Sequence, residues 1–226
     1  MRFTRPAFVL CLALGAAACG SDRDIQSAAF ASLGQLFTPK QAPAPVTDAQ
    51  ILEALQINAK PLILVEFEER NNAQGLLAQV ETNGAYYTFG NQSRNVIVLR
   101  DGMITATRGL GGDLMSVEED ALLSLIHGRR AGQASYVQRF LLPEAVTQEL
   151  DFQCAARPVG SKRVTRGLVN EEATTVKVDC YGKDTETDAQ IEFTNSYAVS
   201  SSGVILSARQ WVGSYLGHIE TQYLRR

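Results

Sequence analysis

The sequence predicts a mainly β protein, with antiparallel strands curved into a sandwich or a partly closed barrel and two or three short helices. Two observations carry this fold class: many segments alternate apolar and polar residues at the two-residue period of a strand, and turn signals separate them. The segment Asn95–Leu114 shows both, because alternating runs flank Asp101-Gly102. Asp-Gly is the strongest short hairpin signal, since both turn positions need a positive φ. With 226 residues, the chain is long enough to bury the core of such a domain.

The first part of the domain is expected to begin with a helix and to continue as strands. Thr47 is suited to the N-cap of this helix, Gln50 completes a capping box, and Pro61 ends the segment after the helix. The strands expected next are Pro61–Glu69, Leu76–Val80, Ala85–Phe89, Val96–Arg100 and Met103–Thr107.

A second helix is expected from Ser116, which can cap it, with Glu119 completing a capping box and Gly128 closing the helix in the left-handed conformation. The C-terminal half is expected to be nearly all strand. Its predicted strands are Ala134–Leu142, Glu149–Arg157, Ala173–Tyr181, Ala189–Val199, Val204–Ser214 and His218–Leu224. Arg157–Gly160 is interpreted as one of the turns between them.

Residues 1–18 have the features of a bacterial signal peptide, with two arginines before an apolar run that is too short to span a bilayer. The run ends in AAACG, which resembles a lipobox and makes Cys19 the expected acylated (palmitate-bearing) N-terminus, although Ala16 stands where Leu is usual. The alternative is ordinary A-x-A cleavage, which would leave a free thiol at Cys19. Gly20 and Ser21 follow Cys19, and the lack of an Asp directly after it favours the outer membrane.

The domain organisation follows from this leader. Residues 19–46 are expected to hold the lipid anchor, a short helix at Asp24–Phe37 and a Pro/Ala linker at Thr38–Val46. Residues 47–226 form a single β-rich periplasmic domain in this prediction. A net charge of −3 without a basic block argues against a nucleic-acid partner.

The cysteines predict one disulfide bond. Cys11 leaves with the leader and Cys19 takes the lipid, so Cys154 and Cys180 remain on strand-like segments in an oxidising compartment. The alternative is a pair of buried free thiols. No metal site and no cofactor are expected, because the chain has no CxxC motif and its two histidines lie far from these cysteines in sequence.

Few side chains suggest a reaction. Glu66, Glu68 and Glu69 could supply a carboxylate pair for glycoside hydrolysis, but alternating glutamates on a strand more often form a solvated face. No serine lies in a G-x-S-x-G elbow. Aromatic residues could stack on sugar rings, although aromatic side chains in a core or on a sheet are more common. They are Tyr86, Tyr87, Phe89, Tyr197, Trp211, Tyr215 and Tyr223.

The chain resembles the YjbF/GfcB family of lipoproteins, which are associated with group 4 capsule and related exopolysaccharide operons. The resemblance covers most of the mature chain and rests on the lipobox, the strand-rich C-terminal half and one motif, G-x-I-x-x-T-x-GL-x-x-DL. That motif corresponds here to Gly102, Ile104, Thr107, Gly109, Leu110, Asp113 and Leu114. The resemblance implies a lipid-anchored, periplasm-facing protein with an outer-membrane β-barrel and other export proteins as partners. It supplies no catalytic residue.

Two functions are therefore expected from different classes. The first is an accessory lipoprotein of exopolysaccharide or capsule export that acts by binding and is not an enzyme, with polysaccharide as a candidate ligand. Arg108, Gly109, Leu110 and Asp113 are its candidate interaction surface; the alternative is a structural bend with an Arg108–Asp113 contact. The second function is a periplasmic glycan-modifying enzyme. A cleft with two close carboxylates, one of raised pKa, would favour the enzyme.

Overall fold

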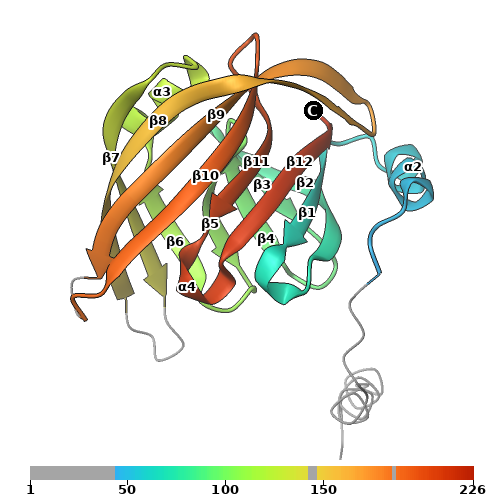
Figure 1. Ribbon diagram of the computed structural model, residues 1–226. Helices are drawn as coiled ribbons and strands as arrows, with labels where there is room; N and C mark the ends of the chain where they lie inside the picture. The colour runs from blue at the N-terminus through green and yellow to red at the C-terminus, as the bar shows by residue number, and fades with distance from the viewer. Residues whose placement is uncertain (1–43, 142–146, 185–186) are drawn as a thin grey trace, which may run out of the picture. The chain divides into compact units, whose positions relative to one another are not determined.

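A computed structural model describes residues 44–141, 147–184 and 187–226 of the chain. Its strands form one twelve-stranded antiparallel sheet that is nearly closed into a barrel (Figure 1). The strand order is β5-β4-β3-β2-β1-β12-β11-β10-β9-β8-β7-β6. The predicted fold class is confirmed, in its barrel form rather than its sandwich form.

The bounds of the strands agree with the prediction for most of the chain. They are β1 Leu62–Phe67, β2 Ala73–Asn83, β3 Tyr86–Gly90, β4 Val96–Arg100, β5 Met103–Arg108, β6 Asp113–Glu118, β7 Gly132–Leu141, β8 Thr147–Arg166, β9 Val169–Asp184, β10 Gln190–Ser200, β11 Ile205–Trp211 and β12 His218–Arg225. The helices in the described ranges are α2 Asp48–Ile57, η1 Glu68–Arg70, α3 Asp120–His127 and α4 Gly213–Leu216. Neither α2 nor any other described helix combines the length and the apolar character needed to cross a bilayer.

The main core lies on the inner face of the sheet, where alternate residues of each strand meet. Ile63 and Val65 of β1 point inward, whereas Leu62 and Leu64 belong to a second, smaller core on the outer face. Burial on both faces explains why β1 begins as a continuous apolar run.

Helix α2 covers this outer patch. Its N-cap is Thr47, and the predicted capping box with Gln50 is present. Ile51 and Leu55 of the helix pack in the same outer cluster as Leu224. The helix is therefore held by apolar burial on one side and by its cap at the start.

The hairpin of β4 and β5 around Asp101-Gly102 forms as predicted. Asp101 and Gly102 both have positive φ, at 51° and 92°. A Cβ atom on Gly102 would lie 2.5 Å from the carbonyl oxygen of Ile205, so the turn also depends on a close backbone approach.

The prediction for the second helix was wrong at its start and at its end. Ser116 lies in β6 opposite Arg139, and Glu119 occupies the N-cap without a side-chain capping bond. Gly128 is right-handed, and the following Arg129 takes the positive φ. Strand pairing of β6 with β7 gives Ser116 backbone partners that a helix would have to replace, which is why tertiary structure overrides the local signal.

The predicted turn at Arg157–Gly160 was also wrong. Strands β8 and β9 continue through it, and only a register shift between Pro158 and Gly160 marks the place. The true turn is Gly167-Leu168, where Gly167 has a φ of 61°. We call the projecting part of this hairpin, residues 158–173, the arm; in Figure 1 it curves over one end of the barrel towards α2. The Leu168 N–H donates to the carbonyl of Leu224, which fastens the arm to β12.

A polar network crosses the barrel interior. The amide of Gln210 on β11 both accepts from the N–H of Ile104 (2.9 Å) and donates to its carbonyl (2.7 Å), as a neighbouring strand would. Gln138 and Gln210 each donate to the hydroxyl of Tyr136 at 3.2 Å. These three polar side chains are fully buried, and they connect β7, β11 and β5 across the core.

Candidate functional site

A cavity of about 410 Å³ opens on the inner face of the sheet, at the end that carries the β4–β5 and β10–β11 turns. Its size is in the range of small-molecule sites, and barrel mouths are a preferred place for them. The residues that line it are Pro61, Gln79, Tyr87, Phe89, Asp101, Val204, Tyr223 and Arg226. We call it the mouth cavity.

The aromatic residues singled out from the sequence separate into three groups. Tyr87, Phe89 and Tyr223 line the mouth cavity, with the rings of Phe89 and Tyr223 edge to face at 5.9 Å. Tyr197 and Trp211 are buried in the main core and are structural. The exposed Tyr86 and Tyr215 lie elsewhere on the surface. The fold therefore gathers at one cavity three aromatic residues from two strands distant in sequence.

Polar groups stand beside these rings. Burial raises the pKa of Tyr223 to about 12, and Asp101 adds to this effect, so the hydroxyl stays protonated and able to donate at neutral pH. The exposed Asp101 lies 3.8 Å from Nε2 of His127, and burial lowers the pKa of that histidine. The mouth cavity thus combines aromatic faces with a carboxylate, an amide and a guanidinium.

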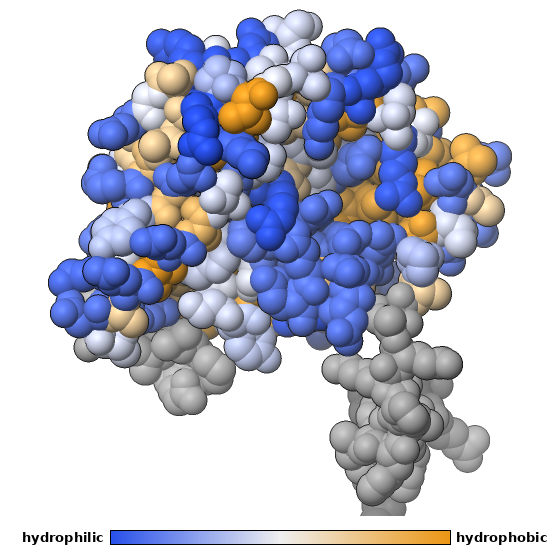
Figure 2. Space-filling model, in the orientation of Figure 1, coloured by the Kyte–Doolittle hydropathy of each residue, from blue (hydrophilic) through white to orange (hydrophobic). Residues whose placement is uncertain are grey.

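A second, smaller pocket of about 220 Å³ lies on the outer face, between the arm and strands β1, β10, β11 and β12. Hydrophilic side chains gather on this front face of the molecule (Figure 2). The floor of the pocket includes Glu66, Arg209 and Glu220, and the arm supplies Lys162 and Arg166. We call it the arm pocket.

The arm pocket holds two carboxylates that face each other. Glu66 and Glu220 are direct partners in the β1–β12 register, an unfavourable position for like charges. Partial burial, together with the charges of Glu66 and Glu68, raises the pKa of Glu220. Glu66 accepts a 2.5 Å hydrogen bond from Gln74. A pocket with two close carboxylates, one of raised pKa, is the feature that would favour a glycan-modifying enzyme over a binding protein.

Glu68 and Glu69 do not continue the strand as predicted, because the chain turns into η1 after Phe67. Glu68 binds Arg209 through two hydrogen bonds of 2.5 and 2.6 Å, and this interaction lowers its pKa. Glu69 lies beside His218. Glu68, Glu69 and His218 each offer one ligand atom, and these three atoms lie within 4.8 Å of one another. The sequence did not predict that Glu68 and Glu69 lie beside His218, because His218 is far from them along the chain.

The glycine-rich loop after β5 is organised by Asp113. Its carboxylate accepts from the N–H groups of Gly109 (2.9 Å) and Leu110 (3.1 Å) and from the hydroxyl of Thr107 (3.0 Å). Arg108 donates to the carbonyls of Thr107 and Leu114 rather than to Asp113. The loop thus joins the two edge strands, β5 and β6, of the nearly closed sheet.

The loop residues differ in what they offer to a partner. Leu110 is buried in the main core at 5% exposure, so its side chain does not form a surface. The Asp113 carboxylate already accepts hydrogen bonds from groups of the loop. Arg108 and Gly109 are exposed, and Arg108 is the side chain that a partner could reach.

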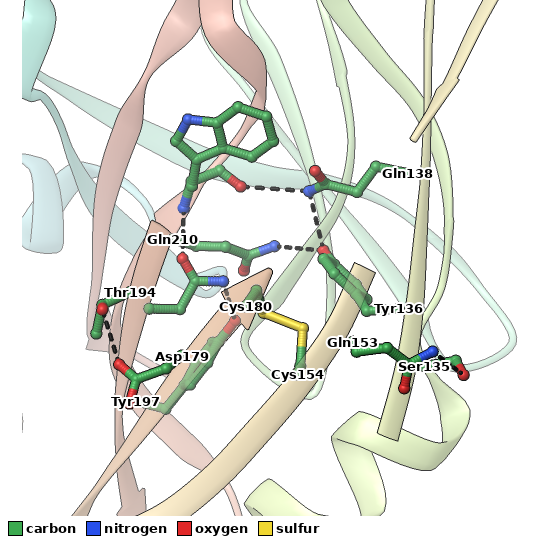
Figure 3. Close-up of a disulfide and its surroundings, with 12 residues drawn as sticks. Ser135, Tyr136, Gln138, Gln153, Cys154, Asp179, Cys180, Thr194, Tyr197 and Gln210 are labelled. Carbon is green, nitrogen blue, oxygen red and sulfur yellow. Dashed lines mark hydrogen bonds between the residues drawn. A yellow bond between two sulfur atoms is a disulfide. The ribbon is translucent and has the colours of Figure 1, made fainter. Parts of the chain in front are cut away.

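Cys154 and Cys180 form a disulfide bond, which agrees with the prediction. They are direct partners in the β8–β9 register and both point into the core (Figure 3). Figure 3 also shows the buried hydrogen bonds of Tyr136, Gln138 and Gln210 near the bridge. The predicted lipid site, Cys19, lies outside the described residues.

Together these features define a mainly β domain of nearly closed barrel form with one aromatic-lined and one charged pocket. The chain belongs to the family described as group 4 capsule polysaccharide lipoprotein GfcB, YjbF, whose model matches residues 27–224. The resemblance noted from the sequence is thereby confirmed. Comparison with curated proteins gave no match.

Two solved structures are similar to this chain. The hypothetical lipoprotein YmcC from Escherichia coli K12 shares 13% identity with a TM-score of 0.66, over 87% of this chain and 94% of its own. A candidate lipoprotein from Parabacteroides distasonis ATCC 8503 shares 8% identity with a TM-score of 0.33, over 74% of this chain and 94% of its own. The YmcC structure shows that the fold occurs in another lipoprotein.

Proposed function

We propose that this protein is a lipid-anchored accessory protein of exopolysaccharide or capsule export, held at the outer membrane and facing the periplasm, and that it acts by binding. Membership of a capsule polysaccharide lipoprotein family supports the pathway. The observation that carries the mode of action is the mouth cavity, where three aromatic residues and several polar groups line one ligand-sized space.

A sugar ring suits this chemistry. Its C–H face packs on an aromatic ring, and its hydroxyls pair with carboxylate, amide and phenol groups. Tyr87 is only partly buried and so can present its ring to a ligand, and Asp101 can accept hydrogen bonds from hydroxyls. We propose that the mouth cavity binds part of the exported polysaccharide.

The test is polysaccharide binding by the purified full-length protein in detergent, with polymer from the source cells as the probe. Tyr87→Ala is expected to weaken binding about tenfold, equivalent to the roughly 1.4 kcal/mol that a good aromatic contact supplies. Asp101→Asn removes the charge while keeping a residue that tolerates the positive φ of the turn, and should also weaken binding. Tyr215→Ala is the matched control, because Tyr215 is 64% exposed and is not part of the cavity. Equal affinity for all four proteins would contradict the cavity assignment.

We further propose that Arg108 contributes to a surface for an export partner, such as an outer-membrane β-barrel. The test is co-purification of partners from detergent-solubilised envelope, identified by mass. Arg108→Glu should reduce recovery of a partner, with only a small fall in melting temperature from the loss of the Arg108 hydrogen bonds to the carbonyls of Thr107 and Leu114. Asp113→Ala is expected instead to lower stability, because it removes the acceptor that holds the loop. Unchanged recovery with Arg108→Glu would leave the loop with its structural role alone.

A glycan-modifying enzyme is the second candidate, favoured specifically by Glu66 and Glu220 in the arm pocket. Glycoside hydrolysis needs two carboxylates, one of them protonated to act as the acid. Incubation of polymer with protein, followed by size analysis, tests it. Chain shortening by the wild type that is lost in Glu220→Gln would replace the binding function with an enzymatic one; polymer of unchanged length supports binding.

A further inference from the structure

We propose that Glu68, Glu69 and His218 form a binding site for a divalent transition metal ion, with Zn²⁺ as the best fit. The site lies where η1 meets the start of β12, outside the mouth cavity. One ligand atom from each residue lies within 4.8 Å of the other two. An imidazole nitrogen with two carboxylate oxygens is a donor set that Zn²⁺ accepts, with water completing the tetrahedron.

His218 is oriented as metal-binding histidines usually are. Its Nε2 lies 3.2 Å from the carbonyl oxygen of Thr194, which can only accept, so Nε2 carries the proton. Nδ1 then presents its lone pair, and Oε1 of Glu69 lies 3.9 Å from it. A backbone carbonyl on the distal nitrogen fixes the tautomer and ring orientation needed for a ligand. Two electron-rich atoms that face each other at this distance are attracted by a cation between them.

One oxygen of the Glu69 carboxylate accepts a backbone hydrogen bond, and Gly217 leaves room for the group. Oε2 of Glu69 accepts from the backbone N–H of His218 at 2.9 Å, which leaves Oε1 for another partner. Gly217 provides the room, because a Cβ there would lie 1.8 Å from the Glu69 carboxyl carbon. The backbone of Gly217, at a φ of 66°, thus admits the carboxylate beside His218.

Glu68 is paired with Arg209, and this pairing has a ready substitute. Arg209 is the direct register partner of Glu220 in the β11–β12 pair. When Glu68 turns an oxygen to the metal, the guanidinium can bind Glu220 instead. That exchange places the cation beside Glu68 and Glu69 and relieves the carboxylate pair of Glu66 and Glu220.

The His218–Glu69 pair requires only a small contraction, whereas the Glu68 oxygen, which lies within 4.8 Å of the other two ligand atoms, must move further as it leaves Arg209. Zinc bonds of about 2.1 Å in a tetrahedron place ligand atoms roughly 3.4 Å apart. The Nδ1–Oε1 separation of 3.9 Å is therefore about half an ångström from the required value. Glu69 is exposed, so its side chain can move by this amount without disturbing the core.

The test is metal titration of the tag-free full-length protein in detergent, after dialysis against chelator. Zn²⁺ binding is followed by calorimetry, and Co²⁺ serves as a probe through its visible absorption. The wild type should bind one ion of either metal and gain melting temperature with Zn²⁺. His218→Gln removes a ligand, so it should lower the affinity by at least the roughly 100-fold that loss of a ligand's hydrogen-bond partner can cost.

His127→Gln is the matched control, because the chain contains two histidines and this is the other one. It should bind metal like the wild type. Glu69→Gln, which keeps an acceptor for the His218 N–H, is a second variant in case His218→Gln does not fold, and it should also lose affinity. No binding by the wild type, equal binding by His218→Gln, or preference for Ca²⁺ over Zn²⁺ would each overturn the assignment.

Discussion

At the scale of single residues, the Gln210 side chain makes the two backbone hydrogen bonds that a neighbouring strand would make to Ile104. Ile104 lies in β5 at the edge of the sheet order, so its outward backbone groups have no neighbouring strand to pair with. The Gln210 amide satisfies both groups from across the core. A buried backbone group without a partner costs about as much as a lost hydrogen bond, so this side chain supports the nearly closed form of the sheet.

Gln210→Leu is therefore expected to lower the free energy of unfolding by at least about 2 kcal/mol, because it leaves the N–H and the carbonyl of Ile104 buried and unpaired. Urea denaturation followed by circular dichroism measures it. Gln153→Leu is the control, since Gln153 is an exposed amide on β8 and should change stability by no more than about 0.5 kcal/mol. Equal stability of the two variants would show that the Gln210 hydrogen bonds do not stabilise the nearly closed form of the sheet.

Protonation of His127 is expected to make the stability of the fold depend on pH. Burial lowers the pKa of His127, and Arg100 also lowers it, against the opposing effect of Asp101. The folded pKa is below the unfolded value of 6.5, so the unfolded state binds the proton first and stability is lost as the pH falls through 6.5. Melting temperatures between pH 7.5 and 5.5 should fall for the wild type and fall less for His127→Gln. An identical slope for both proteins would show that protonation of His127 is not the cause.

At the scale of elements, the sequence predicts strands well and connections less well. Alternation of apolar and polar residues located nearly every strand, and Asp101-Gly102 located the turn between β4 and β5. The arm was missed because Arg157–Gly160 carries a turn signal, whereas β8 pairs with β9 on both sides of a register shift between Pro158 and Gly160. Helix α3 was started too early at Ser116, because local capping chemistry does not reveal that β6 pairs with β7.

The disulfide bond stabilises the longest hairpin of the described sheet. It joins β8 to β9 across a sequence separation of 26 residues. Replacement of Cys154 and Cys180 by Ala should lower the free energy of unfolding by about 3–4 kcal/mol, the chain-entropy value for a loop of that length. Urea denaturation of the variant and of reduced wild type should give similar midpoints. Free alkylatable thiols at both positions in periplasmic protein would rule out the bridge.

At the scale of the whole molecule, barrel curvature creates the candidate sites. The mouth cavity draws Tyr87 from near one end of the sheet order and Tyr223 from its middle, and η1 meets His218 only because β1 pairs with β12. The types of residue at these sites could be read from the sequence. Their spatial proximity could not be predicted, because it depends on which strands become neighbours in the sheet. Disulfide pairing could be predicted because only two cysteines remained for it.

The proposed lipid anchor at Cys19 predicts where the molecule lies in the cell. Buried acyl chains contribute about 0.8 kcal/mol per methylene, so a multiply acylated cysteine holds the protein on the membrane. Cys19→Ala should therefore move the protein from the membrane fraction to the soluble periplasm, as measured by osmotic release and immunoblotting. Cys11→Ala, inside the apolar part of the predicted leader, is the matched control and should leave the protein on the membrane. If Cys19→Ala stays with the membrane to the same extent as the control, contacts of the domain rather than lipid must hold it there.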